Sequence, residues 1–165
     1  MRNGISRRID RDGLRYGPGE RIELGYGPHA AYTLPVEALR SVASHAQERG
    51  ALLHIHLAET VEEDAALRAE HGSVPAMLDR LGVFGGRVLA AHGVHLSDDD
   101  IGLLAARGAA VAHCPGSNAK LAAGVARVAA LRRAGFRSAL APTARPPATT
   151  STSGPRPGSP ACWPG

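Results

Sequence analysis

Residues 52–60 read LLHIHLAET, an apolar run that ends in histidines and a glutamate. A short apolar run of this length is typical of a strand buried in a sheet. His54, His56 and Glu59 stand near the end of that strand, and buried polar groups cost free energy unless they are paired. Two interpretations remain open for this stretch alone. The residues form a chemical site, or His54 is a hydrogen-bonded core histidine and Glu59 opens the next helix.

The residues around this stretch repeat its pattern of short apolar runs followed by helical segments. Helices are predicted to start near Pro35, Thr60 and Ser97, and three aspartates after Ser97 complement the helix dipole. Strands that alternate with helices indicate parallel βα units, so the predicted fold class is α/β. The predicted strands lie within ALLHIHLA (51–58), RVLAAH (87–92), AAVAHC (109–114) and FRSAL (136–140).

The composition sets limits on the class of protein. The 165 residues suffice for one domain, and 44% are hydrophobic. The net charge of +4 comes with scattered arginines and only 4% aromatic residues, which argues against nucleic-acid binding. No stretch is long and apolar enough to span a membrane, and the polar start MRNGISRRID is unlike a signal peptide. With only two cysteines and no disulfide framework, the sequence predicts a cytoplasmic protein.

The character of the sequence changes after residue 140. The segment 141–165 holds seven of the twelve prolines and has no acidic residue and no histidine. It lacks a periodic apolar face, which is typical of a disordered segment. We therefore expect a folded unit over residues 1–140 and a disordered tail over residues 141–165.

Histidines recur at the ends of the extended runs. An extended run ends at His29 within GYGPHAAYT (25–33), His56 lies in the opening stretch, His92 ends VLAAH and His113 ends AAVAH. In a parallel barrel the carboxyl ends of the strands form one face, and barrel enzymes do their chemistry there. Histidine supplies neutral nitrogen ligands for a divalent metal, and a nearby carboxylate can move protons. Glu59 is the candidate for that carboxylate. The pattern therefore indicates metal-dependent hydrolysis.

Four motifs in order, GPHAAYTL, HIHLAET, AAHGVHL and HCPGSNAKL, closely resemble the amidohydrolase superfamily over about residues 11 to 140. The most similar branch holds S-adenosylhomocysteine/methylthioadenosine deaminases, guanine deaminases and triazine chlorohydrolases. The resemblance implies a (β/α)8 TIM-type barrel with one divalent metal, Zn²⁺ or Fe²⁺. It implies that His56 is a metal ligand, that Glu59 is the proton shuttle and contacts the substrate, that His29 binds substrate, and that His92 orients the metal-bound water.

The function implied by this resemblance is hydrolytic deamination of a purine or related N-heterocycle by metal-bound hydroxide. The alternatives are dechlorination of a triazine-like ring and a non-catalytic remnant of such an enzyme. The expected partner is a small-molecule substrate, with no nucleic acid and no membrane. A homo-oligomer is compatible with the intact protein.

The remaining candidates receive structural interpretations. His113, Ser117, Asn118 and Lys120 belong to the seventh-strand motif and are expected to support the site rather than react. His95 is a further candidate for such support, whereas His45 and His71 are expected to be solvated helix residues. His54 is expected to point away from His56, toward the helices. Cys114 is interpreted as a packing residue.

Part of the family pattern is missing. The resemblance implies an H-x-H pair on the first strand and an Asp in a Gly-Thr-Asp-Gly segment after the eighth. The sequence has no such pair before residue 54, because HIH at 54–56 belongs to the fifth strand by its LAET continuation, and no Gly-Thr-Asp-Gly follows FRSAL. A complete barrel needs about 250 residues, so we expect a partial barrel covering roughly the fourth to the eighth strand, which would make this chain a fragment of an enzyme. Removing one base from a GC-rich coding of Gly-Thr-Asp-Gly-Pro-Ala-Ala-Ser-Asn-Asn-Leu-Asp reproduces residues 141–152. A one-base frameshift after Leu140 is therefore our hypothesis for the tail.

Overall fold

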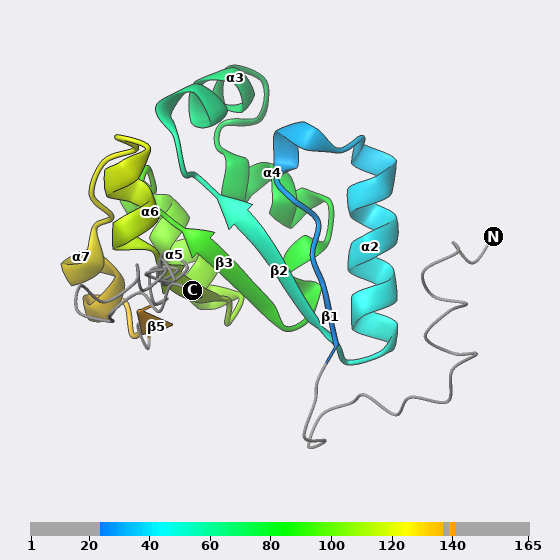
Figure 1. Cartoon of the computed structure of the whole chain (residues 1–165). Helices are drawn as coiled ribbons and strands as arrows, with labels where there is room; N and C mark the ends of the chain where they lie inside the picture. The colour runs from blue at the N-terminus through cyan, green and yellow to red at the C-terminus, as the bar shows by residue number, and fades with distance from the viewer. Residues whose placement is uncertain (1–23, 137–138, 141–165) are drawn as a thin grey trace, which may run out of the picture.

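The computed structural model describes residues 24–136 and 139–140, and its centre is a parallel five-stranded sheet (Figure 1). The strands follow one another in the sheet in chain order, from β1 to β5. Because the strands are parallel, the chain must return to the amino end of the sheet after each strand, as it does in a helical crossover. The strands are β1 (Gly25–Tyr26), β2 (Leu52–Leu57), β3 (Val88–His92), β4 (Ala110–His113) and β5 (Ala139–Leu140).

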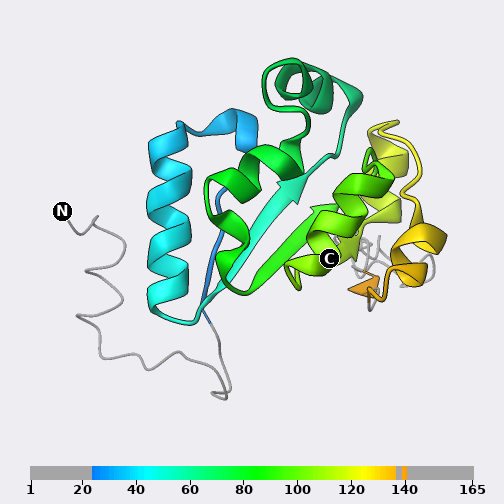
Figure 2. The same ribbon diagram turned by 180° about the vertical axis from the view of Figure 1, so that it is seen from behind.

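The helices alternate with the strands along the chain. The view from behind in Figure 2 shows the helices over residues 74–80 and 98–106 in front of the sheet, whereas the helix over residues 61–71 lies beyond the end of β2. The sheet and its crossovers confirm the predicted α/β class and the parallel βα units. The helices are α2 (Val36–Glu48), α3 (Val61–His71), α4 (Val74–Arg80), α5 (Asp98–Ala106), α6 (Pro115–Lys120) and α7 (Val128–Arg133), with 3-10 turns η1 (Ala31–Thr33) and η2 (Val83–Gly85). None of the helices in the described ranges is long and apolar enough to cross a bilayer.

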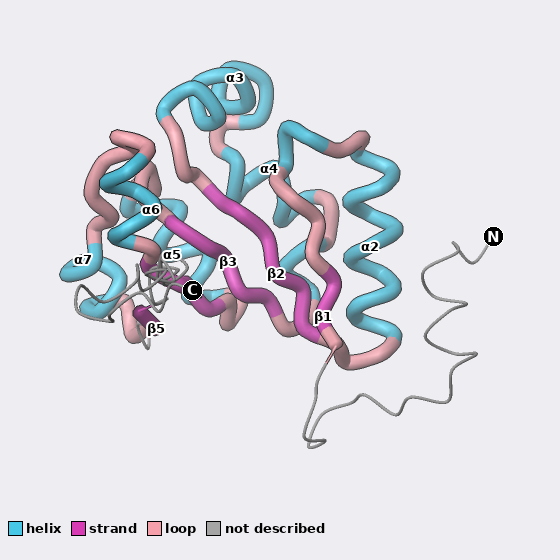
Figure 3. Tube along the Cα trace, viewed as in Figure 1, coloured by secondary structure: helices cyan, strands magenta, loops and turns pink. Residues whose placement is uncertain are grey.

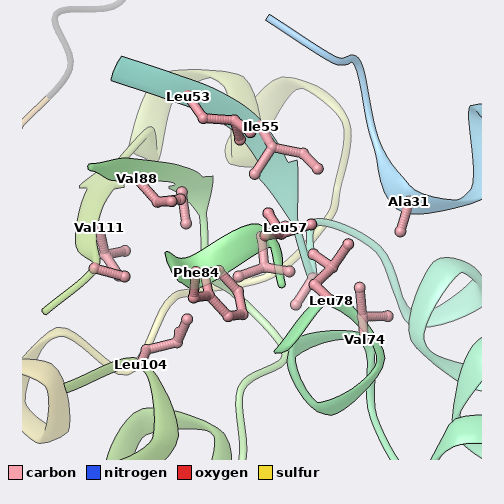
Figure 4. Close-up of a cluster of buried hydrophobic side chains, with 14 of the residues drawn as sticks. Ala31, Leu53, Ile55, Leu57, Val74, Leu78, Phe84, Val88, Leu104 and Val111 are labelled. Atoms are coloured by element: carbon pink, nitrogen blue, oxygen red, sulfur yellow. The ribbon is translucent and has the colours of Figure 1, made fainter. Parts of the chain in front are cut away.

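The core lies between the sheet and the helices. Leu53, Ile55 and Leu57 of β2 point into it and are at most 2% exposed. Figure 4 shows these side chains with Leu78 of α4 and Leu104 of α5 in one apolar cluster. Burial of this apolar face is the main favourable contribution to folding.

The two faces of β2 correct one prediction. His54 does not point away from His56 toward the helices: it is exposed on the same face as His56, and the two rings are 6.5 Å apart. Residues two apart share a face of a strand, so the expectation misapplied the alternation. The helix-facing positions belong to the leucines and the isoleucine between them.

The helix starts agree with the sequence at Thr60 and Ser97. Each side chain accepts a hydrogen bond from the backbone N–H three residues later. Pro35 lies one position earlier than expected, as the N-cap residue of α2 rather than in its first turn. The carboxylate of Asp100 also accepts the backbone N–H of Ser97 at 2.9 Å, which completes a capping box.

Replacing Ser97 with alanine is expected to destabilise the protein by about 0.5–2 kcal/mol, because the N–H of Asp100 loses its acceptor. Urea denaturation of the full chain measures this change. Ser97→Thr keeps the hydroxyl and should restore most of the loss. Equal stability of the alanine variant and the parent protein would contradict this role for the cap.

The division of the chain into a folded unit over residues 1–140 and a tail over residues 141–165 stays a prediction. Residues 1–23 and 137–138 of the predicted unit and the whole segment 141–165 lie outside the described residues, and the frameshift hypothesis concerns that last segment.

Candidate active site

The candidate site lies at the carboxyl ends of β1, β2 and β3, where the loops traced in Figure 3 leave the sheet. His56 stands near the end of β2. Its Nδ1 is 2.8 Å from the carbonyl oxygen of His29, and its backbone N–H donates to the same oxygen at 2.9 Å. A carbonyl oxygen can only accept, so Nδ1 carries the proton. The Nε2 atom of the neutral ring therefore keeps its lone pair and can act as a ligand or acceptor.

Glu59 follows β2 in the loop that leads to α3. Its Oε1 lies 3.4 Å from Nδ1 of His92, and the two side chains are 17% and 6% exposed. Glu63 stabilises this loop, because its Oε2 accepts a hydrogen bond from the backbone N–H of Glu59 at 3.0 Å. The structure thus places a half-buried carboxylate beside a buried imidazole.

His92 ends β3 with an unusual backbone conformation. Its φ angle is 75°, in the left-handed region, and the next residue, Gly93, also has a positive φ of 57°. A non-glycine residue held there costs about 1–3 kcal/mol, and such residues cluster at functional sites. The His92 ring lies 5.2 Å from the ring of His56, and its Nδ1 lies 2.8 Å from Oδ1 of Asn118 in α6.

His29 completes the group from the loop after β1. Its exposed ring lies 4.8 Å from that of His56 and 6.2 Å, edge to face, from that of Tyr32. The four residues predicted for the site, His29, His56, Glu59 and His92, therefore come together from three neighbouring strand ends. Their assigned roles stay predictions.

Glu63 was not among the residues predicted for the site, although it is only 6% exposed behind Glu59. Burial raises the pKa of the Glu63 carboxyl, and the nearby charge of Glu59 adds to this rise, while the backbone N–H groups around it oppose it. The T-x-x-E spacing of Thr60 and Glu63 is the capping-box signal that could have drawn attention to it.

The raised pKa of Glu63 gives a pH dependence of stability. Because the folded pKa lies above the unfolded one, its contribution is fully present below the unfolded pKa and is lost as pH rises through the folded pKa. Glu63→Gln should therefore gain stability relative to the parent protein between mildly acidic and neutral pH. Urea denaturation across this range measures the difference, with exposed Glu62→Gln as the matched control. A constant difference between the parent protein and Glu63→Gln would contradict the prediction.

His54 lies beside the site on the open face of β2. Partial burial lowers the pKa of His54, and the proximity of His56 and His92 lowers it further, because several positive rings so close together repel one another. The structure thus favours the neutral form of His54.

The other predicted residues divide into supporting and remote positions. Asn118 is 1% exposed and contacts His92, which supports its predicted secondary role. The Nε2 atom of His95 lies 2.8 Å from the carbonyl oxygen of Ala123, so this ring binds the loop after α6. His113 has a buried Nδ1 without a hydrogen-bond partner among the described residues, and Lys120 is exposed. Four predicted residues remain. His45 and His71 are half-buried helix residues, Ser117 lies in α6, and Cys114 is the N-cap residue of that helix.

The metal predicted from the sequence needs more ligands than this part of the chain offers. Within the described residues no group of three histidine, cysteine or carboxylate side chains is arranged to hold an ion. Catalytic zinc is usually held by three protein ligands. His56 is the side chain best prepared as one ligand, because a carbonyl oxygen fixes its Nδ1 proton. The donor set among the described residues is therefore incomplete for a resident metal.

A comparison with protein families decides the relationship. The model of the amidohydrolase family matches residues 7–142, most of the chain. The chain belongs to the amidohydrolase family. The family expectation from the four motifs is confirmed, and the match spans the whole sheet.

Curated amidohydrolase relatives carry deaminase names. The 5-methylthioadenosine/S-adenosylhomocysteine deaminase of Pelotomaculum thermopropionicum is 49% identical over 120 residues, covering 72% of this chain and 28% of the relative. The corresponding Archaeoglobus fulgidus protein, deaminase 1, is 44% identical over 117 residues, covering 70% and 28%. This amidohydrolase chain thus spans about 28% of the length of these relatives.

Solved amidohydrolase structures share the fold. An adenosine deaminase from Xanthomonas campestris with bound zinc superposes with a TM-score of 0.73 at 37% identity, covering 82% of this chain and 31% of that one. An atrazine chlorohydrolase mutant from Arthrobacter aurescens, complexed with zinc and atraton, gives a TM-score of 0.71 at 23% identity, covering 82% and 30%. The five-stranded sheet is therefore a partial amidohydrolase barrel, as predicted.

Proposed function

We propose that this chain supplies the proton-transfer and substrate-side part of an amidohydrolase active site that deaminates a purine or related N-heterocycle. The observation that carries this proposal is the contact between Glu59 and His92 at 3.4 Å, beside the ring of His56. A half-buried carboxylate next to a buried imidazole is an arrangement that can move protons. The relatives at 42–49% identity are named as deaminases of adenine-containing thioethers, which favours that substrate class.

The residues divide the reaction between them. Hydrolytic deamination adds water to a ring carbon and releases ammonia, so a proton must leave the water and another must reach the amino group. Glu59 is assigned this transfer, and His92 holds its carboxylate in place. The exposed ring of His29 is assigned to substrate binding. A divalent metal, Zn²⁺ or Fe²⁺, would supply activated water when bound, and His56 is the one ligand assigned from this chain.

A segment exchange tests the function. The matched 120 residues of the Pelotomaculum thermopropionicum deaminase would be replaced by those of this chain, and ammonia release would be measured with methylthioadenosine, S-adenosylhomocysteine, adenosine and guanine. We expect clear turnover with at least one adenine-containing substrate. A folded, zinc-loaded chimera that releases no ammonia from any of them would contradict the proposal.

The alternatives are distinguished by two further measurements. Chloride release from atrazine by the chimera would favour dechlorination of a triazine ring over deamination as the reaction. For the chain alone we expect well under one metal ion per chain and poor turnover, because its donor set is incomplete. Near-stoichiometric metal with clear turnover would contradict that expectation. Cytoplasmic location, the absence of nucleic-acid partners and homo-oligomerisation stay predictions.

A further inference from the structure

Asn118 reaches His92 from a different part of the fold. It lies in α6, 26 residues further along the chain, and its buried Oδ1 is 2.8 Å from Nδ1 of the His92 ring. The same nitrogen lies 3.4 Å from Oε1 of Glu59. Two oxygen atoms therefore face one ring nitrogen.

This arrangement determines where the proton of a neutral His92 ring lies. Carboxylate and amide oxygens accept hydrogen bonds, so a lone pair on Nδ1 would be repelled by both neighbours. With the proton on Nδ1, the lone pair belongs to Nε2. A histidine side chain in water prefers the opposite form, with the proton on Nε2, so the protein selects the less common tautomer.

The opposite orientation of the Asn118 amide fits these surroundings less well. It would direct an N–H toward Nδ1 of His92 and leave a lone pair there, facing the carboxylate of Glu59. Either orientation leaves one buried amide atom without a partner among the described residues, and as the amide is placed here that atom is Nδ2. The carboxylate of Glu59 is therefore what decides between the two orientations.

We propose that Asn118 is a positioning residue that fixes His92 as the tautomer protonated on Nδ1. The Nε2 atom of His92 is then an acceptor that can receive a hydrogen bond or a proton, while the Nδ1–H group faces Asn118 and Glu59. The catalytic consequence rests on the proposed function, whereas the tautomer is a property of this chain and needs neither metal nor substrate.

The test is ¹⁵N NMR of histidine-labelled full chain at a pH where the ring is neutral, with His92→Gln used to assign the signal. We expect a protonated Nδ1 and an unprotonated Nε2 for His92 in the parent protein. Asn118→Ala should shift the ring toward the Nε2-protonated form, and Asn118→Asp, which keeps an oxygen acceptor, should retain the parent pattern. A purely structural role for Asn118 would change stability and leave the tautomer as it is.

Two outcomes would overturn the inference. One is a parent protein with the proton on Nε2, which decides the matter even if Asn118→Ala does not fold. The other is Glu59→Gln shifting the tautomer while Asn118→Ala leaves it unchanged, because Glu59 would then be the controlling acceptor. In the chimera, the corresponding Asn→Ala change should lower kcat more than it changes KM. An inactive chimera combined with the expected NMR result would contradict the proposed function and leave this inference standing.

Discussion

Glu59→Gln in the deaminase chimera is expected to lower turnover by about 100- to 10,000-fold, the usual contribution of a general acid–base group. Glutamine has nearly the same size as glutamate and keeps an oxygen acceptor near His92. In the parent chain, Nδ1 of His92 lies 3.4 Å from Oε1 of Glu59. It cannot take up and release the proton. The measurements are ammonia release under single-turnover conditions and metal content by mass spectrometry.

The control for this variant is Glu62→Gln, an exposed carboxylate three residues away in the same helix-initiating segment. It should change turnover little. The metal content of Glu59→Gln should equal that of the parent chimera, because Glu59 is assigned to proton transfer and not to the ion. An empty site in Glu59→Gln would mean that the carboxylate is a ligand and that our assignment is wrong.

His56→Ala in the same chimera is expected to lose the metal itself and, with it, all measurable turnover. The ring presents Nε2 as a neutral nitrogen donor because its Nδ1 proton is held by the carbonyl oxygen of His29 at 2.8 Å. Removing a group that only supports a ligand costs about 10- to 100-fold in metal affinity, so loss of the ligand should cost more than about 100-fold.

Zinc affinity of His56→Ala is measured by competition with a chelating dye. His45→Ala is the matched control, because His45 lies in α2 and hydrogen-bonds the carbonyl of its own helix at Ser41. It should leave zinc affinity unchanged. Full zinc occupancy in His56→Ala would contradict the assignment of His56 as a ligand.

The sheet could be predicted from the sequence because its signals are local. A run such as LLHIHL puts Leu53, Ile55 and Leu57 on one buried face, and the structure has β2 over Leu52–Leu57. The caps at Thr60 and Ser97 were likewise readable from a residue and its third neighbour. The parallel βα units followed from the alternation of predicted strands and helices.

The interior of the site could be predicted only in part. The histidines were recognisable because strand ends share one edge, but the contact of Asn118 with His92 depends on how α6 packs after β4. No sequence period reports such a contact. Glu63 escaped notice because a glutamate in a helix start is commonly solvated, whereas here it lies under the Glu59 loop at 6% exposed. The misplacement of His54 was an error in applying the strand period, not a limit of the sequence.

The double hydrogen bond at the carbonyl oxygen of residue 29 has a consequence for how such a site can change. Both the backbone N–H and the ring Nδ1–H of His56 donate to that oxygen, so the ring is oriented by a peptide group and not by a side chain. Every amino acid supplies this carbonyl. Substitutions at position 29 can therefore alter the surface offered to a new substrate while the His56 ring keeps its orientation. Position 29 can thus vary during evolution at little structural cost.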